Sequence, residues 1–134
     1  MIFYLDTNIC IYSLNGRFPA IASFMQRRAP ADIKIPSIVE AELLLGAKKS
    51  LKPDDTLEKI QKFLSPFEVI PFDHKAAGVY ADIRAQLEKQ GKIIGPNDLV
   101  IAATVLANHG TLITHNAREF SRVPHLKIED WTKG

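Results

Sequence analysis

The sequence has little cysteine, little excess charge and no long hydrophobic run. Its one cysteine, Cys10, excludes an internal disulfide, and its apolar surroundings predict a small core residue in a reducing compartment. The net charge of only +2 excludes a strongly basic nucleic-acid clamp and a disordered acidic tail. No secretory signal precedes the first apolar run, and no run approaches the roughly 20 residues that cross a bilayer. We therefore expect a cytoplasmic protein without a membrane anchor.

What is present suits one compact domain over residues 1–134. A chain of 134 residues with 46% hydrophobic content buries roughly two-thirds of its unfolded surface. Short strand-like runs alternate with longer helical patterns, which predicts an α/β fold built on a parallel sheet. We expect strands near 2–5, 33–35, 67–70 and 111–114, a short edge strand in the tail, and helices near 9–12, 21–28, 38–48, 53–64, 74–90 and 98–106.

Polar side chains follow the predicted strands. Asp6 comes directly after the first strand, and His115 and Asn116 come after the fourth. Ligands of open parallel sheets bind at the carboxyl ends of the strands, so we expect these residues near one site. Asp98 in the first turn of an apolar helix and Glu42 on an earlier helix are two further candidates.

Both of these helical acids are predicted to face apolar surroundings. Helical spacing places Ile38, Val39 and Leu45 around Glu42, and Asp98 opens a helix that is apolar all round. A buried carboxylate costs several kcal/mol unless a cation sits beside it, and no Lys or Arg adjoins them in sequence. A bound Mg²⁺ would keep such carboxylates ionised and accept their oxygens as ligands.

Asp6 also has a purely structural interpretation. In the sequence Asp6-Thr7-Asn8, Asp6 could serve only as a helix cap or an Asx turn. Thr7 or Asn8 could equally cap the helix that follows. These residues alone therefore do not decide between capping and chemistry.

The other candidates have structural alternatives as well. Asp98 could stabilise a helix start through the macrodipole. Glu40 competes with Glu42 for the inward position, because the periodicity does not separate them. Asn116 and Glu119 could simply cap a short helix. These candidates indicate a functional site only when they are taken together.

Several sequence fragments, taken in order, carry a family resemblance. They are Leu5-Asp6-Thr7-Asn8, Ala41-Glu42-Leu43 with Gly46, Gly95-Pro96-Asn97-Asp98-Leu99 with Ile101-Ala102-Ala103, Thr114-His115-Asn116 with Arg118-Glu119-Phe120, and Ile128-Glu129-Asp130-Trp131. With this order and spacing, nearly the whole chain resembles the PIN-domain ribonucleases, and within them the VapC toxins of bacterial toxin–antitoxin pairs.

The resemblance implies an α/β/α sandwich around a parallel sheet, with an acidic pocket that binds Mg²⁺ or Mn²⁺ and hydrolyses RNA phosphodiester bonds. It makes Asp6 and Asp98 the principal metal ligands, and Glu42 completes the cluster directly or through a water. Many members carry an Asp where this chain has Asn116, which puts a strong second metal site in doubt. Glu119 would then supply the missing charge as a further catalytic residue. Thr7 could bind the metal shell or a substrate phosphate.

The resemblance also implies partners. VapC-like proteins often cut tRNA near the anticodon, and this chain looks like the subgroup associated with initiator tRNA. Members commonly form homodimers and are silenced by a small VapB-like antitoxin that places a basic side chain near the carboxylates. The apolar residues of 20–25 and Leu43-Leu44 could form a groove for that partner, or belong to the core.

Two rival functions remain open from the sequence. A non-catalytic PIN-like RNA-binding or interaction domain would keep the fold and lose the chemistry, and Asn116 argues faintly for it. A phosphatase of the haloacid dehalogenase type also places an Asp after its first strand, but it needs a second acid where this chain has Asn8.

Overall fold

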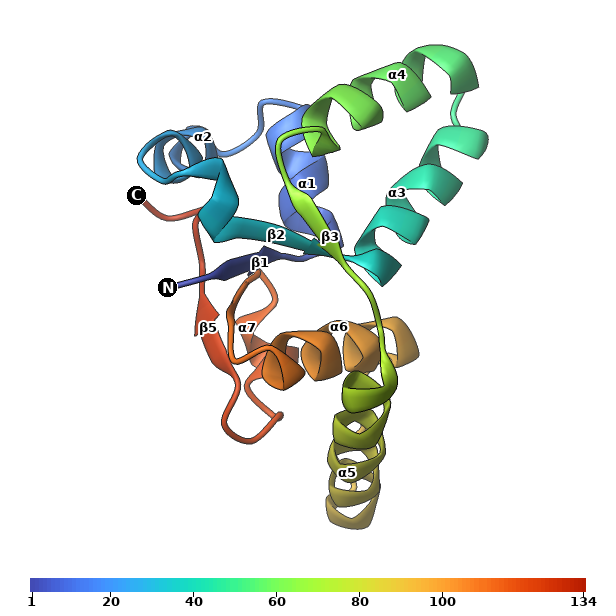
Figure 1. Ribbon diagram of the computed structural model, residues 1–134, viewed down its shortest axis with the longest axis vertical. Coiled ribbons are helices and arrows are strands. Elements are labelled where there is room, and N and C mark those ends of the chain that lie inside the picture. The colour runs from blue at the N-terminus through green and yellow to red at the C-terminus, as the bar shows by residue number, and fades with distance from the viewer.

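The computed structural model describes residues 1–134 and contains one five-stranded sheet (Figure 1). All neighbouring strands are parallel, in the order β3-β2-β1-β4-β5. This confirms the predicted α/β fold, including the edge strand expected in the tail. The strands are β1 (Phe3–Leu5), β2 (Ile33–Pro36), β3 (Glu68–Ile70), β4 (Thr111–Ile113) and β5 (Lys127–Glu129).

Helices cover both faces of the sheet (Figure 1). In that view α1 and α2 lie on one side, and α6 lies on the other with α5 packed against it. None of the helices combines the length and the apolar character that crossing a membrane requires. The helices are α1 (Thr7–Leu14), α2 (Pro19–Gln26), α3 (Ser37–Lys48), α4 (Pro53–Leu64), α5 (His74–Gln90), α6 (Pro96–Ala107) and α7 (Ala117–Phe120), with a 3₁₀ turn at Pro30–Asp32.

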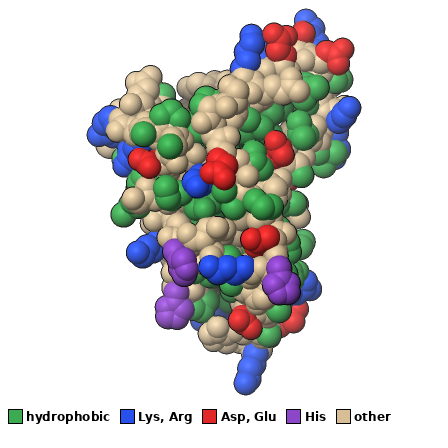
Figure 2. All heavy atoms as spheres, in the orientation of Figure 1, with side chains coloured by type: hydrophobic (Ala, Val, Ile, Leu, Met, Phe, Trp, Pro, Cys, Tyr) green, Lys and Arg blue, Asp and Glu red, His purple; other side chains and the backbone are tan.

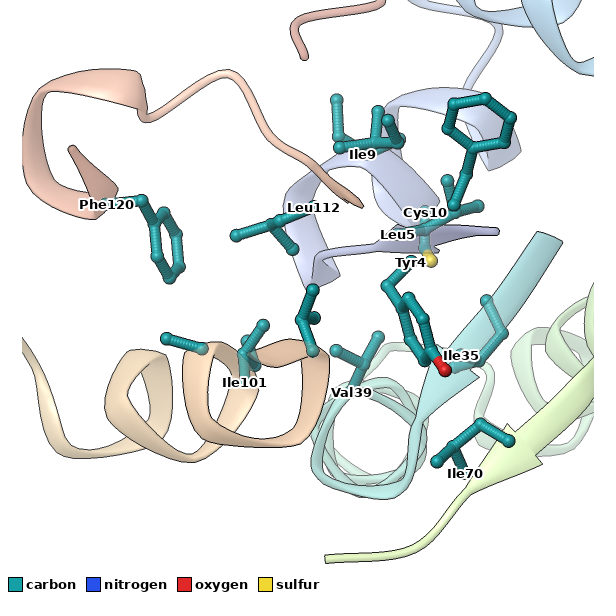
Figure 3. Close-up of a cluster of buried hydrophobic side chains, with 14 of the residues drawn as sticks. Tyr4, Leu5, Ile9, Cys10, Ile35, Val39, Ile70, Ile101, Leu112 and Phe120 are labelled. Atoms are coloured by element: carbon teal, nitrogen blue, oxygen red, sulfur yellow. The ribbon is translucent and has the colours of Figure 1, made fainter. Parts of the chain in front are cut away.

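The core lies between the sheet and these helices (Figure 3). β1 and β4 are buried at every residue, as expected for central strands covered on both faces. Ile101 of α6 and Leu112 of β4 are part of this core and are fully buried. Cys10 is also fully buried, which confirms its prediction as a core residue.

The apolar groove that the sequence suggested for a partner is largely core. Ile21 and Leu43 are buried, and Phe24 stacks on the buried Trp131 at 5.5 Å between ring centres. Trp131 also contacts Phe3 of β1 at 5.2 Å between ring centres. Only Leu44 of the proposed groove stays substantially exposed. Of the two interpretations that the sequence left open for these residues, membership of the core therefore holds for Ile21 and Leu43, and Phe24 packs against the C-terminal segment.

One helix boundary moves a candidate residue. α6 begins at Pro96, whereas the sequence predicted a start at Asp98. Proline suits the first helical position because its fixed φ is preorganised and its missing N–H would be unpaired there in any case. Asp98 is therefore the third residue of the helix.

A close backbone approach fixes the start of β4. A Cβ atom added at Gly110 would lie 2.3 Å from a ring carbon of Tyr4. Real side chains do not tolerate such a separation, so the absence of a side chain at Gly110 lets the loop before β4 pass over the Tyr4 ring.

The strand order places a crevice between β1 and β4. The chain leaves β1 toward β2 on one side and reaches β4 only after β3, α5 and α6. In open α/β sheets, ligands bind at such a switch point, outside the carboxyl ends of the strands. Leu5 is in register with Ile113, and the Asp6 amide donates to the Ile113 carbonyl at 3.1 Å. Asp6 and Thr114 therefore follow adjacent strands at the same edge.

Candidate active site

Asp6 is the most buried carboxylate of the site, with 6% of its surface exposed. Its Oδ1 accepts the Ile9 amide at 2.9 Å, so Asp6 itself caps α1. The prediction that Thr7 or Asn8 caps this helix was wrong, because the helix already begins at Thr7. The Thr114 hydroxyl donates a second hydrogen bond to the Asp6 carboxylate.

Burial dominates the charge state of Asp6. It raises the pKa of this carboxyl to about 6, although the hydrogen bonds from Thr114 and Ile9 act in the opposite direction. The nearby carboxylates of Glu42 and Asp130 raise the pKa further. No Lys or Arg forms an ion pair with Asp6. Asp6 is thus a cap and also an uncompensated buried acid, so its role as a cap does not exclude a role in the chemistry.

Asp98 and Glu119 form a hydrogen-bonded pair of acids. Burial, the hydrogen bond to Glu119 and the charge of Glu119 together raise the pKa of Asp98 to about 7. The charges of Asp6 and Glu42 act in the same direction. Asp98 is half-buried, as its place on an apolar helix predicted, but its neighbours include three other acids.

Glu119 is held by donors from two segments. The Gly95 amide donates to Glu119 Oε1 at 2.7 Å, and the Asn116 side-chain amide donates to Oε2 at 2.9 Å. The Gly95 bond is the main reason that the pKa of Glu119 lies below its ordinary value. Asn116 precedes α7 without forming a side-chain cap, so its amide orients Glu119 instead. The simple capping interpretation of these two residues is therefore wrong.

Glu42 sits among polar partners. Its Oε1 accepts the Thr7 hydroxyl at 2.6 Å, and its Oε2 accepts the Asn97 side-chain amide at 3.2 Å. The apolar surroundings predicted for Glu42 were wrong, because Leu45 is 53% exposed and points away from the core. These hydrogen bonds also separate Glu42 from its sequence rival Glu40, which takes no part in them.

Some residues of the site had no assigned role in the sequence prediction. Thr114 supports Asp6 and also accepts the Asn116 backbone amide at 2.9 Å. Asn97 and Gly95 supply donors to the two glutamates. In the sequence, a role for these residues was indicated only by their position close to Asp98 or Asn116, within the fragments that carry the resemblance.

The structure thus brings Asp6, Glu42, Asp98 and Glu119 close enough for their charges to interact. Their side chains do not form a compact group of three or more metal ligands. Glu42 is turned toward α1 and α6 by its hydrogen bonds, and Asp98 is turned toward Glu119. The arrangement nevertheless provides hard oxygen donors without a neutralising cation, and no thiolate or imidazole joins them.

Two surface hollows lie away from the four carboxylates or at their margin. One of about 640 Å³ lies over α4, where Figure 2 shows acidic and basic side chains mixed at the top of the view. It contains none of the four carboxylates. A smaller hollow of about 240 Å³ between α1, α3 and α4 includes Glu42 on one wall.

Relatives with known names match this chain over almost its whole length. Residues 3–126 match the PIN domain family. Ribonuclease VapC2 of Rickettsia felis is 42% identical over 134 residues, which cover 99% of this chain and 100% of the relative. The tRNA(fMet)-specific endonuclease VapC of Salmonella typhimurium is 37% identical over 129 residues, which cover 96% of this chain and 97% of the relative.

Solved structures agree with these sequence matches. The fold is similar to a chain of VapBC2 from Rickettsia felis bound to a promoter DNA fragment, with a TM-score of 0.92 and 42% identity over 98% of this chain and 99% of that chain. It is also similar to a chain of DNA-bound VapBC from Salmonella typhimurium, with a TM-score of 0.93 and 37% identity over 98% of each chain. The chain therefore belongs to the PIN-domain ribonucleases and, within them, to the VapC toxins of VapBC toxin–antitoxin systems.

Proposed function

We propose that this chain is a metal-dependent endoribonuclease that cleaves tRNA, with initiator tRNA as its substrate, and that a VapB-like antitoxin silences it. The observation that carries the proposal is the uncompensated carboxylate of Asp6 at the switch point. It interacts electrostatically with Asp98 and Glu42, and none of these three acids has a cationic partner.

The donor set fits a hard divalent cation. Asp6 and Asp98 would hold Mg²⁺, or Mn²⁺ in its place, with Glu42 joining directly or through a water. When bound, such an ion activates a water nucleophile and offsets charge on the scissile phosphate and the leaving oxygen. The raised pKa values of Asp6 and Asp98 support this assignment, because a cation would offset the cost of ionising both acids.

The remaining residues of the site position these acids and hold protons. Thr7 and Asn97 orient the two oxygens of Glu42, and Thr114 orients Asp6. Glu119 shares a hydrogen bond with Asp98 and is itself fixed by the Gly95 amide. We assign Glu119 the role of a further acidic residue of the catalytic site, beside Asp98. The amide at Asn116 keeps Glu119 in place for this role.

The names of two relatives support the proposed substrate. Two VapC relatives, from Salmonella typhimurium and Shigella flexneri, are named tRNA(fMet)-specific endonucleases, and they are 37% and 38% identical to this chain over nearly its full length. This level of identity across the whole domain supports tRNA as the substrate class.

The antitoxin follows from the site and from the related complexes. Similar chains were solved as VapBC complexes. A basic side chain of a VapB-like partner, placed among Asp6, Glu42 and Asp98, would form charge-assisted hydrogen bonds with acids that lack a cation. The expected homodimer stays a prediction. Exposed leucines at the end of α3 support it, and light scattering of the purified protein would test it.

The decisive experiment uses antitoxin-free protein and total bacterial tRNA, with Mg²⁺ or with EDTA. We expect discrete cuts in the initiator tRNA that disappear with EDTA and in Asp98→Ala. The matched control is Asp82→Asn, which removes an exposed acid of α5 and should cleave like the wild type. Failure of the folded wild type to cleave any RNA while still binding tRNA would favour the non-catalytic alternative. Cleavage that survives EDTA would contradict the metal assignment.

A further inference from the structure

Two basic side chains lie at the rim of the site without a role in the chemistry above. His115 directly follows Thr114, whose hydroxyl contacts Asp6. Arg17 lies in the turn between α1 and α2. Although far apart in sequence, the two residues share the same pair of aromatic neighbours.

His115 is held in one orientation by the C-terminal segment. Its Nδ1 lies 3.0 Å from Asp130 Oδ2 and 3.1 Å from Thr132 Oγ1. Asp130 is fixed in turn by Thr132, whose amide and hydroxyl donate to Oδ1 at 2.9 Å and 2.6 Å. The His115 side chain is still 42% exposed, and its Nε2 makes no hydrogen bond within the protein. One ring nitrogen is thus anchored while the other is free for a ligand.

Arg17 is positioned by aromatic rings alone. Its guanidinium carbon lies 5.2 Å from the ring centres of both Tyr12 and Phe18. The His115 ring centre lies 5.4 Å from that of Phe18 and 6.3 Å from that of Tyr12. The two rings therefore form a common support that holds the guanidinium and the imidazole on the same part of the surface.

The donors of Arg17 are unused. Arg28 and Arg122 donate to backbone carbonyls, and Arg84 donates to Glu88. Arg17 is exposed and takes part in no ion pair and no side-chain hydrogen bond. An exposed guanidinium that rings hold in place, without an acid to neutralise it, is suited to bind an anion through its planar fork.

The chemistry of the site indicates which anion. Four acids at the switch point repel the phosphates of an RNA backbone, so cationic side chains beside them are needed for the RNA to bind. The ring-supported guanidinium of Arg17 is a cation of this kind on the Asp6 side of the site, and the imidazole of His115 beside it offers a free ring nitrogen. A phosphodiester offers two oxygens to the guanidinium fork, and Nε2 of His115 can donate to one of them in the imidazolium form, in which Asp130 accepts the Nδ1–H.

We propose that Arg17 and His115 form a subsite for an RNA phosphate next to the scissile one, with Tyr12 and Phe18 as its support. This inference rests on the proposed function and identifies where the protein binds that substrate. It contacts the RNA equally before and during cleavage, so it contributes to substrate binding rather than to the chemical step.

The test is steady-state cleavage of initiator tRNA by Arg17→Gln and His115→Gln in parallel with Arg27→Gln. Arg27 is a matched control at the opposite end of α2, where its guanidinium lies 4.8 Å from the Phe24 ring centre and its Nε donates to the Ser23 carbonyl. We expect KM to rise five- to tenfold in the first two variants, with kcat within twofold of the wild type. Arg27→Gln should keep both constants.

Binding provides a second readout that does not depend on turnover. In an inactive Asp98→Ala background, anisotropy of labelled tRNA should show weaker binding for Arg17→Gln and a salt dependence whose slope is smaller by about 1, as expected for one lost phosphate contact. Arg17→Lys should recover part of the affinity because it keeps the charge and loses the fork. Thermal unfolding of each variant separates loss of contact from loss of fold.

The outcomes separate the subsite from the proposed function. Cleavage by the wild type with equal KM values for Arg17→Gln and Arg27→Gln would overturn the subsite and leave the nuclease intact. A fall in kcat at constant KM would also overturn it. A wild type that cleaves no RNA would overturn the proposed function and the subsite together.

Discussion

Replacing Asp6 by asparagine is expected to stabilise the metal-free protein at neutral pH while it abolishes cleavage. The asparagine side chain keeps an oxygen that can accept the Ile9 amide, so the cap of α1 survives. The carboxylate charge, which burial makes costly, is removed. An active-site substitution that raises stability is expected where a buried acid lacks a compensating cation.

The magnitude follows from the pKa of Asp6. The folded protein keeps this proton up to about pH 6, whereas the unfolded chain releases it near pH 3.8. The stability that this preference contributes is present below pH 3.8 and is lost as the pH rises to about 6. The rise in pKa corresponds to about 3 kcal/mol. Part of the gain from asparagine is offset by the weaker bond to the Thr114 hydroxyl, which leaves about 2 kcal/mol at pH 8.

Urea unfolding in EDTA, followed by fluorescence of the buried Trp131, measures this directly. The two proteins should have nearly equal free energies of unfolding at pH 3.5, and the variant should exceed the wild type by about 2 kcal/mol at pH 8. Asp82→Asn serves as the exposed control and should show no such difference. Addition of Mn²⁺ at pH 8 should stabilise the wild type and leave the asparagine variant unchanged. A variant that is less stable than the wild type at pH 8, or a difference independent of pH, would refute this reasoning.

Two further substitutions test the close packing and the orientation of the site. Gly110→Ala should lower the free energy of unfolding by about 1–3 kcal/mol, because its Cβ would overlap the Tyr4 ring. Urea unfolding measures this change, and an unchanged urea midpoint would contradict the close approach. Thr7→Val should lower tRNA cleavage about tenfold, because it removes the hydroxyl that orients Glu42. It should change the free energy of unfolding by less than about 1 kcal/mol, because the Glu42 carboxylate can still be hydrated by water. Thr7→Ser, which keeps that hydroxyl, should cleave like the wild type.

The sequence predicted the parts of the molecule that depend on local pattern. Asp6 could be found because it directly follows a continuous apolar strand, and Asp98 because it lies in the first turn of a helix that is apolar all round. Both features are readable within a few residues. The order of strands and helices followed from the same alternation of short and long apolar segments.

The rest depends on tertiary contacts that no local pattern encodes. Glu42 and Glu40 differ only in what faces them, and that is set by Thr7 and by Asn97 from segments distant in the chain. Glu119 is likewise fixed by the amide of Gly95, which lies 24 residues away in the chain. Side-chain partners across such sequence separations follow from packing, which periodicity does not describe.

The strand order also determines when the site can form during protein synthesis. β1 carries Asp6 at its end and is made first, but it pairs with β4, which begins at Thr111. A nascent chain that stops short of β4 has Asp6 without Thr114 and without the sheet neighbour that aligns it. Domains fold as their segments emerge during synthesis. The carboxylate site therefore cannot assemble until more than a hundred residues have been joined. A nuclease built in this order cannot act before β4 has been synthesised.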